Sequence, residues 1–221
     1  MNKIGYISAK HTSKLDFVLL SICTIFVVEQ SRMMDTLIPK NGNYKQLLSY
    51  QKSQAIYDMT FYFCTNYIRR TDRTFDQMVQ AARSGKQNIV EGCAASSTSS
   101  KSEIRLINVA KASLMELLED YKDYLRVNGH RQWEMDSVEM SAMRELGKTH
   151  NDSEFFMNLA RTRPPQTIAN MVIVLIMQTD YLLFKQLQAL SDKFLEEGGF
   201  SERMARMRLQ RRNLLDPKKR D

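Results

Sequence analysis

Glycine, proline and cysteine are scarce in this sequence. Its 221 residues include 8 Gly and 4 Pro, which leaves little material for the turns of a β-sandwich or β-barrel. The three cysteines, Cys23, Cys64 and Cys93, lie far apart and form no C-x-x-C pair, so neither a disulfide framework nor a zinc site is indicated. A composition of 43% apolar and 26% charged residues is typical of a globular protein. We therefore expect an all-α protein with one main domain, in a reducing cytoplasm.

Catalytic motifs are missing as well. The sequence contains no G-x-S-x-G, no Walker sequence and no glycine-rich dinucleotide motif. Glu91 and Glu116 would project from adjacent helices, but the E-x-x-H repeats of two-metal helical bundles are absent. No carboxylate or cysteine stands at ligand spacing beside His130 or His150, which we interpret as solvated loop residues. The sequence predicts a protein that is not an enzyme and has no cofactor and no metal; a hydrolase or metalloenzyme is the least favoured class.

A twelve-residue apolar run, Phe17–Val28, is the longest near the start of the chain, and it is too short to span a bilayer. Asp16 interrupts the basic start that a signal peptide would need, and no small-x-small cleavage site follows the run. Residues 1–35 are therefore a leader whose status stays open. It is a core helix, a disordered leader or sequence upstream of a true start at Met33 or Met34, with a signal peptide as the less favoured alternative. We expect no membrane association.

Apolar residues recur at helical spacing along four long stretches. The expected helices span about 44–70, 72–95, 100–128 and 164–197, and form an antiparallel four-helix bundle within residues 36–200, with a small helical insertion at 129–163. The sequence Ser100-Lys101-Ser102-Glu103 has the S-x-x-E form of a capping box and predicts the start of the third helix. An aromatic stripe on the first helix, which includes Tyr57 and Phe61, is interpreted as core.

The fourth expected helix is unusually apolar. Met171–Met177 is apolar on every side, which is more than one seam of a bundle requires. Either the inserted helices or a second subunit must therefore cover this segment.

Polar residues recur on the facing sides of the second and third expected helices. Ser84 and Asn88 are four residues apart and share a helical face with small residues, so two backbones can approach closely there. We interpret Asn88, Glu91, Ser113 and Glu116 as a structural polar network that fixes the register of the helices.

The last 21 residues carry most of the positive charge. Residues 201–221 contain eight basic and three acidic side chains, a net charge of +5 out of +7 for the chain. The basic residues are Arg203, Arg206, Arg208, Arg211, Arg212, Lys218, Lys219 and Arg220. The segment is weakly amphipathic, and its charge and lack of aromatic residues beyond its start also allow disorder. Two interpretations stay open: a solubilising terminus, or an arm that binds the phosphates of nucleic acid without sequence preference.

Paired motifs in the hairpin from Gln80 to Leu118 resemble a family of four-helix bundles. The matching residues are Gln77 with Ala81-Ala82, then Asn88-Ile89 with Glu91-Gly92 (N-I-x-E-G), then Ala110, Ser113-Leu114 and Glu116-Leu117 (A-x-x-S-L-x-E-L). The family includes proteins encoded in intervening sequences of bacterial large-subunit ribosomal RNA genes and the accessory protein (Avd) of diversity-generating retroelements. The resemblance covers roughly residues 44–194, and the insertion at 129–163 departs from the family pattern, whose connection is shorter.

The resemblance implies a homo-oligomer, with a pentamer in the retroelement branch, and RNA, DNA or reverse-transcriptase partners there. Together with the basic tail it predicts a non-catalytic oligomeric bundle that binds nucleic acid or a nucleic-acid-handling protein. The alternative is a structural or protein-interaction bundle with no nucleic-acid role.

Overall fold

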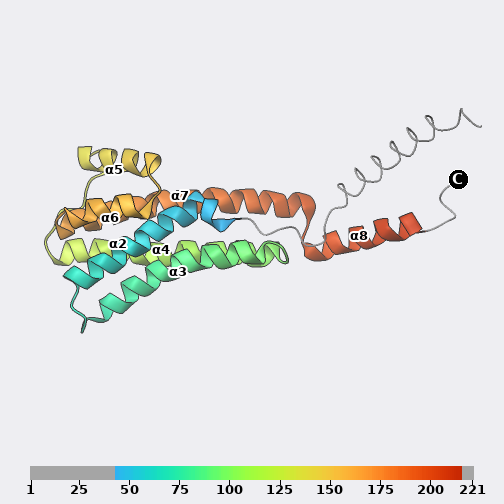
Figure 1. Cartoon of the computed structure of the whole chain (residues 1–221), viewed down its shortest axis with the longest axis horizontal. Helices are drawn as coiled ribbons and strands as arrows, with labels where there is room; N and C mark the ends of the chain where they lie inside the picture. The colour runs from blue at the N-terminus through green and yellow to red at the C-terminus, as the bar shows by residue number, and fades with distance from the viewer. Residues whose placement is uncertain (1–42, 216–221) are drawn as a thin grey trace, which may run out of the picture. The chain divides into compact units, whose positions relative to one another are not determined.

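All the regular secondary structure in the described part of the chain is helical (Figure 1). The computed structural model describes residues 43–215, which belong to the unit Lys40–Asp221; the leader 1–35 and the basic residues Lys218, Lys219 and Arg220 lie outside the described residues. The elements are η1 (Tyr44–Gln46), α2 (Leu48–Tyr67), α3 (Arg73–Ala95), α4 (Ser100–Val127), α5 (Val138–Thr149), α6 (Ser153–Arg161), α7 (Pro165–Glu197) and α8 (Phe200–Leu215). Residues 43–215 contain no strand, so the all-α prediction is confirmed.

Short polar side chains cap the helix starts, because the first N–H groups of a helix have no partner within it. Asp72 Oδ1 accepts a hydrogen bond from the Thr74 N–H at 2.9 Å at the start of α3. At the start of α4, Ser99 Oγ accepts from the Ser102 N–H at 3.1 Å. The prediction that a capping box at Ser100 begins this helix was wrong by one residue, because Ser99 has extended backbone angles and Ser100 is already helical.

Helices α3 and α4 approach each other closely where α3 carries glycine. A Cβ atom on Gly85 would lie 2.6 Å from Leu114 Cδ2, and one on Gly92 would lie 3.2 Å from Ile107 Cδ1. Both glycines are buried, and the leucine and isoleucine side chains of α4 occupy the space that a larger α3 residue would need. The close approach places the polar residues of the two helices within hydrogen-bonding distance.

An aromatic cluster joins α2 to α4 at the other end of the core. The ring of Phe63 is fully buried and lies 5.1 Å from the Tyr121 ring and 4.8 Å from the Tyr124 ring, measured between centroids. The buried Tyr121 hydroxyl donates to Thr60 Oγ1 at 3.1 Å, and burial raises the pKa of Tyr121 well above its usual value. The polar atom of the ring is therefore satisfied inside the core.

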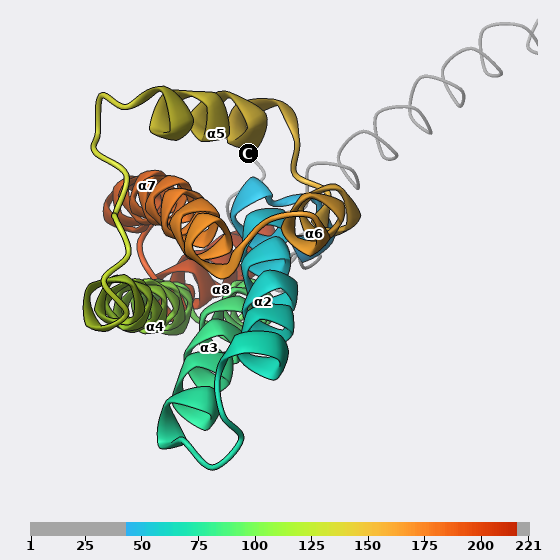
Figure 2. The same ribbon diagram turned by 90° about the vertical axis from the view of Figure 1, so that its left-hand side faces the viewer.

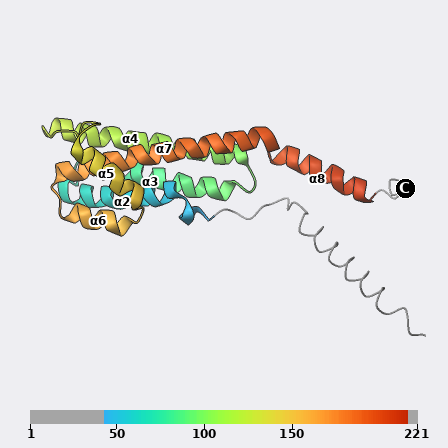
Figure 3. The same cartoon turned by 90° about the horizontal axis from the view of Figure 1, so that it is seen from above.

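The inserted helices cover the sides of the long helices. Figure 2 shows α5 lying over α7 and α6 lying beside α2. Residues 171–176 of α7 are all buried within the single chain, and Met140 and Met143 of α5 are buried with them. Neighbouring helices of the same chain, α5 among them, therefore bury this apolar segment. Figure 3 shows α7 running along α4.

Two polar contacts fix α5 in place. The Lys52 ammonium group of α2, which is 4% exposed, donates to the Gly147 carbonyl near the end of α5. Gln178 Nε2 of α7 donates to the Arg144 carbonyl at 2.9 Å. Burial lowers the pKa of Lys52. A cation at the C-terminal end of a helix is electrostatically favourable, which offsets part of the cost of burying this charge.

Candidate functional site

A polar network of three side chains joins α3 to α4. Ser84 Oγ lies 2.9 Å from Ser113 Oγ, and Asn88 Nδ2 donates to Ser84 Oγ at 3.1 Å and to the Ser84 carbonyl at 2.9 Å. Ser113 is buried, whereas Ser84 and Asn88 are half-buried. Every one of these groups bonds to another member or to the backbone, so the arrangement fixes the register of two helices and presents no activated nucleophile.

Glu91 and Glu116 do not belong to this network. Both are exposed, and neither carboxylate has a hydrogen-bond or ion-pair partner within residues 43–215. The cause is helix phase: the next residues, Gly92 and Leu117, are the ones buried in the helix interface. Of the four residues predicted to form the network, the structure joins Asn88 and Ser113 through Ser84, which the prediction did not include, and leaves the two glutamates outside it.

An acidic side chain of α4 has a raised pKa. Asp120 of α4 is half-buried, and its Oδ2 atom has no hydrogen-bond partner in the described part of the chain. Burial, followed by the charges of Glu116 and Asp123, raises the pKa of Asp120. Burial, assisted by Asp120, also raises the pKa of the Cys64 thiol to about 12, so this cysteine stays protonated and unreactive.

We expect Asp120→Asn to raise the melting temperature at neutral pH. The raised pKa means that the folded state holds the Asp120 proton more tightly than the unfolded state does. The wild-type protein therefore loses stability as the pH rises from the pKa of Asp120 in the unfolded state to its pKa in the folded state. The amide cannot ionise, so the gain should be largest near about pH 7 and vanish near about pH 3, below the usual pKa of about 3.9 for Asp. Thermal unfolding followed by circular dichroism across this range measures the difference.

Asp136→Asn is the matched control, because Asp136 is exposed and does not contribute to the raised pKa of Asp120. This variant should show no gain at neutral pH. A gain for Asp120→Asn that is the same at every pH would contradict the assigned cause.

Five of the eight predicted basic residues lie on α8, and the other three lie outside the described residues. α8 carries five arginines and one glutamate, a net charge of +4. Arg203 is half-buried, whereas the side chains of the other four, Arg206, Arg208, Arg211 and Arg212, are exposed. The sequence allowed disorder in this segment, but the structure forms a helix over Phe200–Leu215. The helix sets the spacing between the guanidinium groups.

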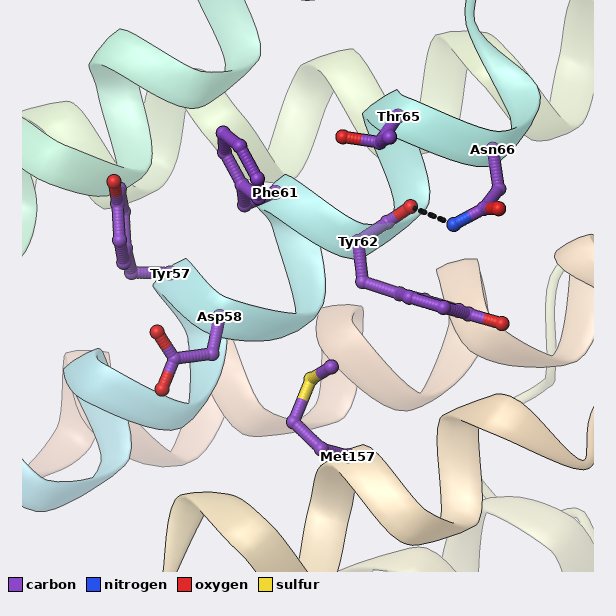
Figure 4. A pocket seen from close by; sticks show the side chains of 7 residues that line it. All are labelled: Tyr57, Asp58, Phe61, Tyr62, Thr65, Asn66 and Met157. Atoms are coloured by element: carbon purple, nitrogen blue, oxygen red, sulfur yellow. Dashed lines mark hydrogen bonds between the residues drawn. The ribbon is translucent and has the colours of Figure 1, made fainter.

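A shallow groove lies between α2 and α6 (Figure 4), lined by Tyr57, Asp58, Phe61, Tyr62, Thr65, Asn66 and Met157. Phe61 is 47% exposed, so the interpretation of the whole aromatic stripe as core was wrong at this position. Two polar groups of the groove are already engaged: Asp58 Oδ2 accepts a hydrogen bond from Ser153 Oγ, and Asn66 Nδ2 donates to the Tyr62 carbonyl at 2.7 Å. The Lys86 ammonium group lies 4.2 Å from the Tyr57 ring centroid. The groove can hold apolar or aromatic groups, but its lining offers no paired acid and base.

The two histidines in the described residues pack on aromatic rings. His150 stacks on Phe155, with ring centroids 3.7 Å apart, and the His130 ring lies 6.1 Å from that of Tyr124. Both are half-buried and lie at the ends of connecting segments. Within residues 43–215, no group of three or more His, Cys, Asp or Glu side chains is placed to hold a metal ion.

One helical stretch among the described residues, Pro165–Asn213, is long and apolar enough to cross a membrane by length and composition alone, with a mean hydropathy of 1.6 in its most apolar window. In the structure, 61% of that window is buried inside the protein. The core helix of a soluble protein passes the same test, so this is weak evidence for a membrane span.

Comparisons with known proteins identify no relative. No family model matches the chain, and no curated protein or solved structure matches it significantly.

Proposed function

We propose that α2, α3, α4 and α7 form an antiparallel four-helix bundle. Contacts between neighbouring helices support this arrangement. The Lys86–Tyr57 contact pairs α3 with α2, the Ser84–Ser113 contact pairs α3 with α4, and the Lys111–Asp180 ion pair joins α4 to α7. Between α2 and α3, Tyr57 contacts Lys86 while the later Cys64 contacts the earlier Met78. Between α3 and α4, Gly85 lies at Leu114 while the later Gly92 lies at the earlier Ile107. Both pairs show the order of contacts that antiparallel helices have.

The protein's proposed role is non-catalytic binding of nucleic acid through α8 and the basic residues that follow it. The observation that carries this proposal is the net charge of +4 on a single helix, with four exposed arginines. Arginine is the preferred residue for phosphate, because its planar guanidinium group can donate two hydrogen bonds to one phosphate and stays charged at all physiological pH values. Such contacts give affinity that depends on salt and shows little sequence preference.

The proposed setting follows the resemblance of the α3–α4 hairpin to the intervening-sequence and retroelement accessory proteins. It includes a homo-oligomer, of which a pentamer is one form, a nucleic acid or reverse-transcriptase-like partner, and a cytoplasmic location without membrane association. The apolar segment of α7 no longer supports a subunit interface, because it is buried within the single chain. The case for an oligomer therefore comes from the resemblance alone.

A protein-interaction module is the second candidate. The observation that favours it is the groove between α2 and α6, where Phe61 and the half-buried Tyr57 and Tyr62 present aromatic surface. Aromatic residues are enriched at protein interfaces. The test below separates the two candidates.

Removal of residues 201–221 should weaken nucleic-acid binding and leave the helical fold intact. Fluorescence anisotropy with labelled single-stranded and double-stranded oligonucleotides, in a salt series, measures the affinity. For the full chain, log K should fall with log salt with a slope of a few units, because each neutralised phosphate contributes about 0.7 to 0.9. The truncated protein should show a flatter slope.

Circular dichroism provides the control for folding of the truncated protein. Equal affinities and equal salt slopes for the two proteins would assign binding to the body of the protein and remove α8 from the proposal. No binding by the full chain at low salt would favour the protein-interaction module.

A further inference from the structure

The five arginines of α8 are not equivalent, because one of them is held against the body of the protein. Arg203 Nη2 donates to the Ser97 carbonyl, in the link between α3 and α4, at 3.4 Å. Its guanidinium carbon lies 5.8 Å from the Phe200 ring centroid, and its Nε atom is buried without a partner among the described residues. Through this hydrogen bond, Arg203 connects the first turn of α8 to the α3–α4 link.

A second arginine belongs to the joint between α7 and α8. α7 ends at Glu197, and the next residue, Gly198, is its C-cap, with a φ of 73° in the left-handed region that favours glycine. Arg206 Nη2 donates to the Glu197 carbonyl, which is one of the C-terminal carbonyls of α7 that lack a partner within the helix. Glu202 Oε2 accepts from the Gly199 N–H at 3.0 Å, which caps the start of α8. Arg206 thus caps one helix while it belongs to the next.

The remaining three arginines form a separate group. Arg211 and Arg212 follow Arg208 by three and four residues, so the three side chains share one face of α8 within about one turn. All three are exposed. Within residues 43–215 the structure gives their guanidinium groups no hydrogen-bond or ion-pair partner. The nearest acidic residue on the helix, Glu202, is engaged at the other end with Gly199.

We infer that the two groups have different roles: Arg203 and Arg206 orient α8, and Arg208, Arg211 and Arg212 bind successive phosphates of a nucleic-acid strand. This assignment rests on the proposed function. Side chains three and four positions apart on a helix have Cβ atoms about 5 to 6 Å apart, and phosphates recur about every 3.4 Å along the axis of one strand, so three long side chains can reach neighbouring phosphates. The three arginines are unpaired, so phosphate binding breaks no existing contact.

Charge-neutralising variants of the full-length chain test the assignment. Arg208→Gln/Arg211→Gln/Arg212→Gln should flatten the log–log salt slope by about 2 to 3 units and weaken binding on the order of 100-fold at about 0.1 M salt, because three phosphate contacts are lost. The matched control, Arg73→Gln/Arg83→Gln/Arg131→Gln, removes the same charge from exposed side chains on other elements and should bind within a few-fold of wild type. The triple lysine variant at 208, 211 and 212 keeps the charge and should keep the salt slope.

The orienting role has its own measurement. Arg203→Gln/Arg206→Gln should leave most of the salt slope in place, and should speed amide hydrogen exchange in the first turns of α8. The triple glutamine variant should leave that exchange unchanged, because its side chains make no contact in the structure.

Failures of the two proposals are distinguishable. If the truncation abolishes binding while the triple glutamine variant binds like wild type, the division of the arginines is wrong and the proposed function stands. If the control triple weakens binding as much as the α8 triple, binding depends on overall charge and the inference is wrong. If the wild-type chain does not bind at low salt, the proposed function itself fails.

Discussion

Phe63→Ala should lower the free energy of unfolding by about 3 to 5 kcal/mol. The Phe63 side chain is fully buried and contacts both Tyr121 and Tyr124 of α4. Truncation removes the transfer free energy of a whole ring, leaves a cavity between α2 and α4, and abolishes two ring–ring contacts. Urea denaturation followed by circular dichroism measures the loss as a lower midpoint with an unchanged slope.

The control for this variant lies two residues away on the same helix. Phe61 is 47% exposed, so Phe61→Ala creates no cavity of comparable size and should cost clearly less than Phe63→Ala. Equal losses for the two variants would mean that the α2 stripe is buried on both sides, for instance by another subunit over the groove. The pair of measurements therefore also tests the exposure of the aromatic groove.

Gly85→Ala should destabilise the protein, although alanine is the better helix former by about 1 kcal/mol. The added Cβ atom would lie 2.6 Å from Leu114 Cδ2 and 2.8 Å from Leu114 Cγ, so the leucine or the helices must move. Overpacking of this kind costs about 1 to 3 kcal/mol. Leu114→Ala alone should cost about 2 to 5 kcal/mol through its cavity.

The double variant Gly85→Ala/Leu114→Ala should lose less stability than the sum of the two single variants, because each change makes room for the other. A coupling free energy of about 1 kcal/mol or more is expected for side chains in direct contact. Gly92→Ala is the control: its Cβ atom would lie 3.2 Å from Ile107 Cδ1, at the flexible end of that side chain, so its cost should be smaller. Additive losses at Gly85 and Leu114 would show that the helices separate instead of repacking.

Helical periodicity located the long helices because burial requires apolar residues at three- and four-residue steps, and that spacing is visible in the sequence. The capping residue of α4 was not visible in the same way. Ser99 and Ser100 are chemically identical capping residues, and only the backbone angles decide which one precedes the helix. The burial of one side of α2 was likewise overestimated at Phe61, because an aromatic residue is compatible with both the core and the edge of a groove.

The polar network shows where pattern reasoning stops. Asn88 and Ser113 lie in the helix interface, but Glu91 and Glu116 lie one position outside it, next to Gly92 and Leu117. A motif that includes both types of residue cannot separate them, because the rotation of each helix is set by packing. Ser84 was on the predicted face, yet its role as the bridge between Asn88 and Ser113 depends on the close approach at Gly85.

The basic residues of α8 illustrate a similar limit. The charge of the segment is evident from composition. The hydrogen bonds that distinguish Arg203 and Arg206 are not, because Arg203 bonds to the carbonyl of Ser97, far away in the sequence, and Arg206 bonds to the carbonyl of Glu197 in the preceding helix. Counting charges treats all five arginines alike. Only the three-dimensional arrangement identifies which of them are available to a ligand.

The packing of α5 determines which part of the protein unfolds first. α5 packs chiefly on α7, whose Gln178 bonds to the α5 backbone, and its other polar contact is with Lys52 of α2. α7, in contrast, also packs against α2 and α4. Elements with few neighbours unfold locally at lower free energy than the elements in the centre of a core. Local unfolding of α5 would expose its buried Met140 and Met143 and the part of α7 that α5 packs on, while the long helices stay folded, so a partly open form with exposed apolar surface lies energetically below global unfolding.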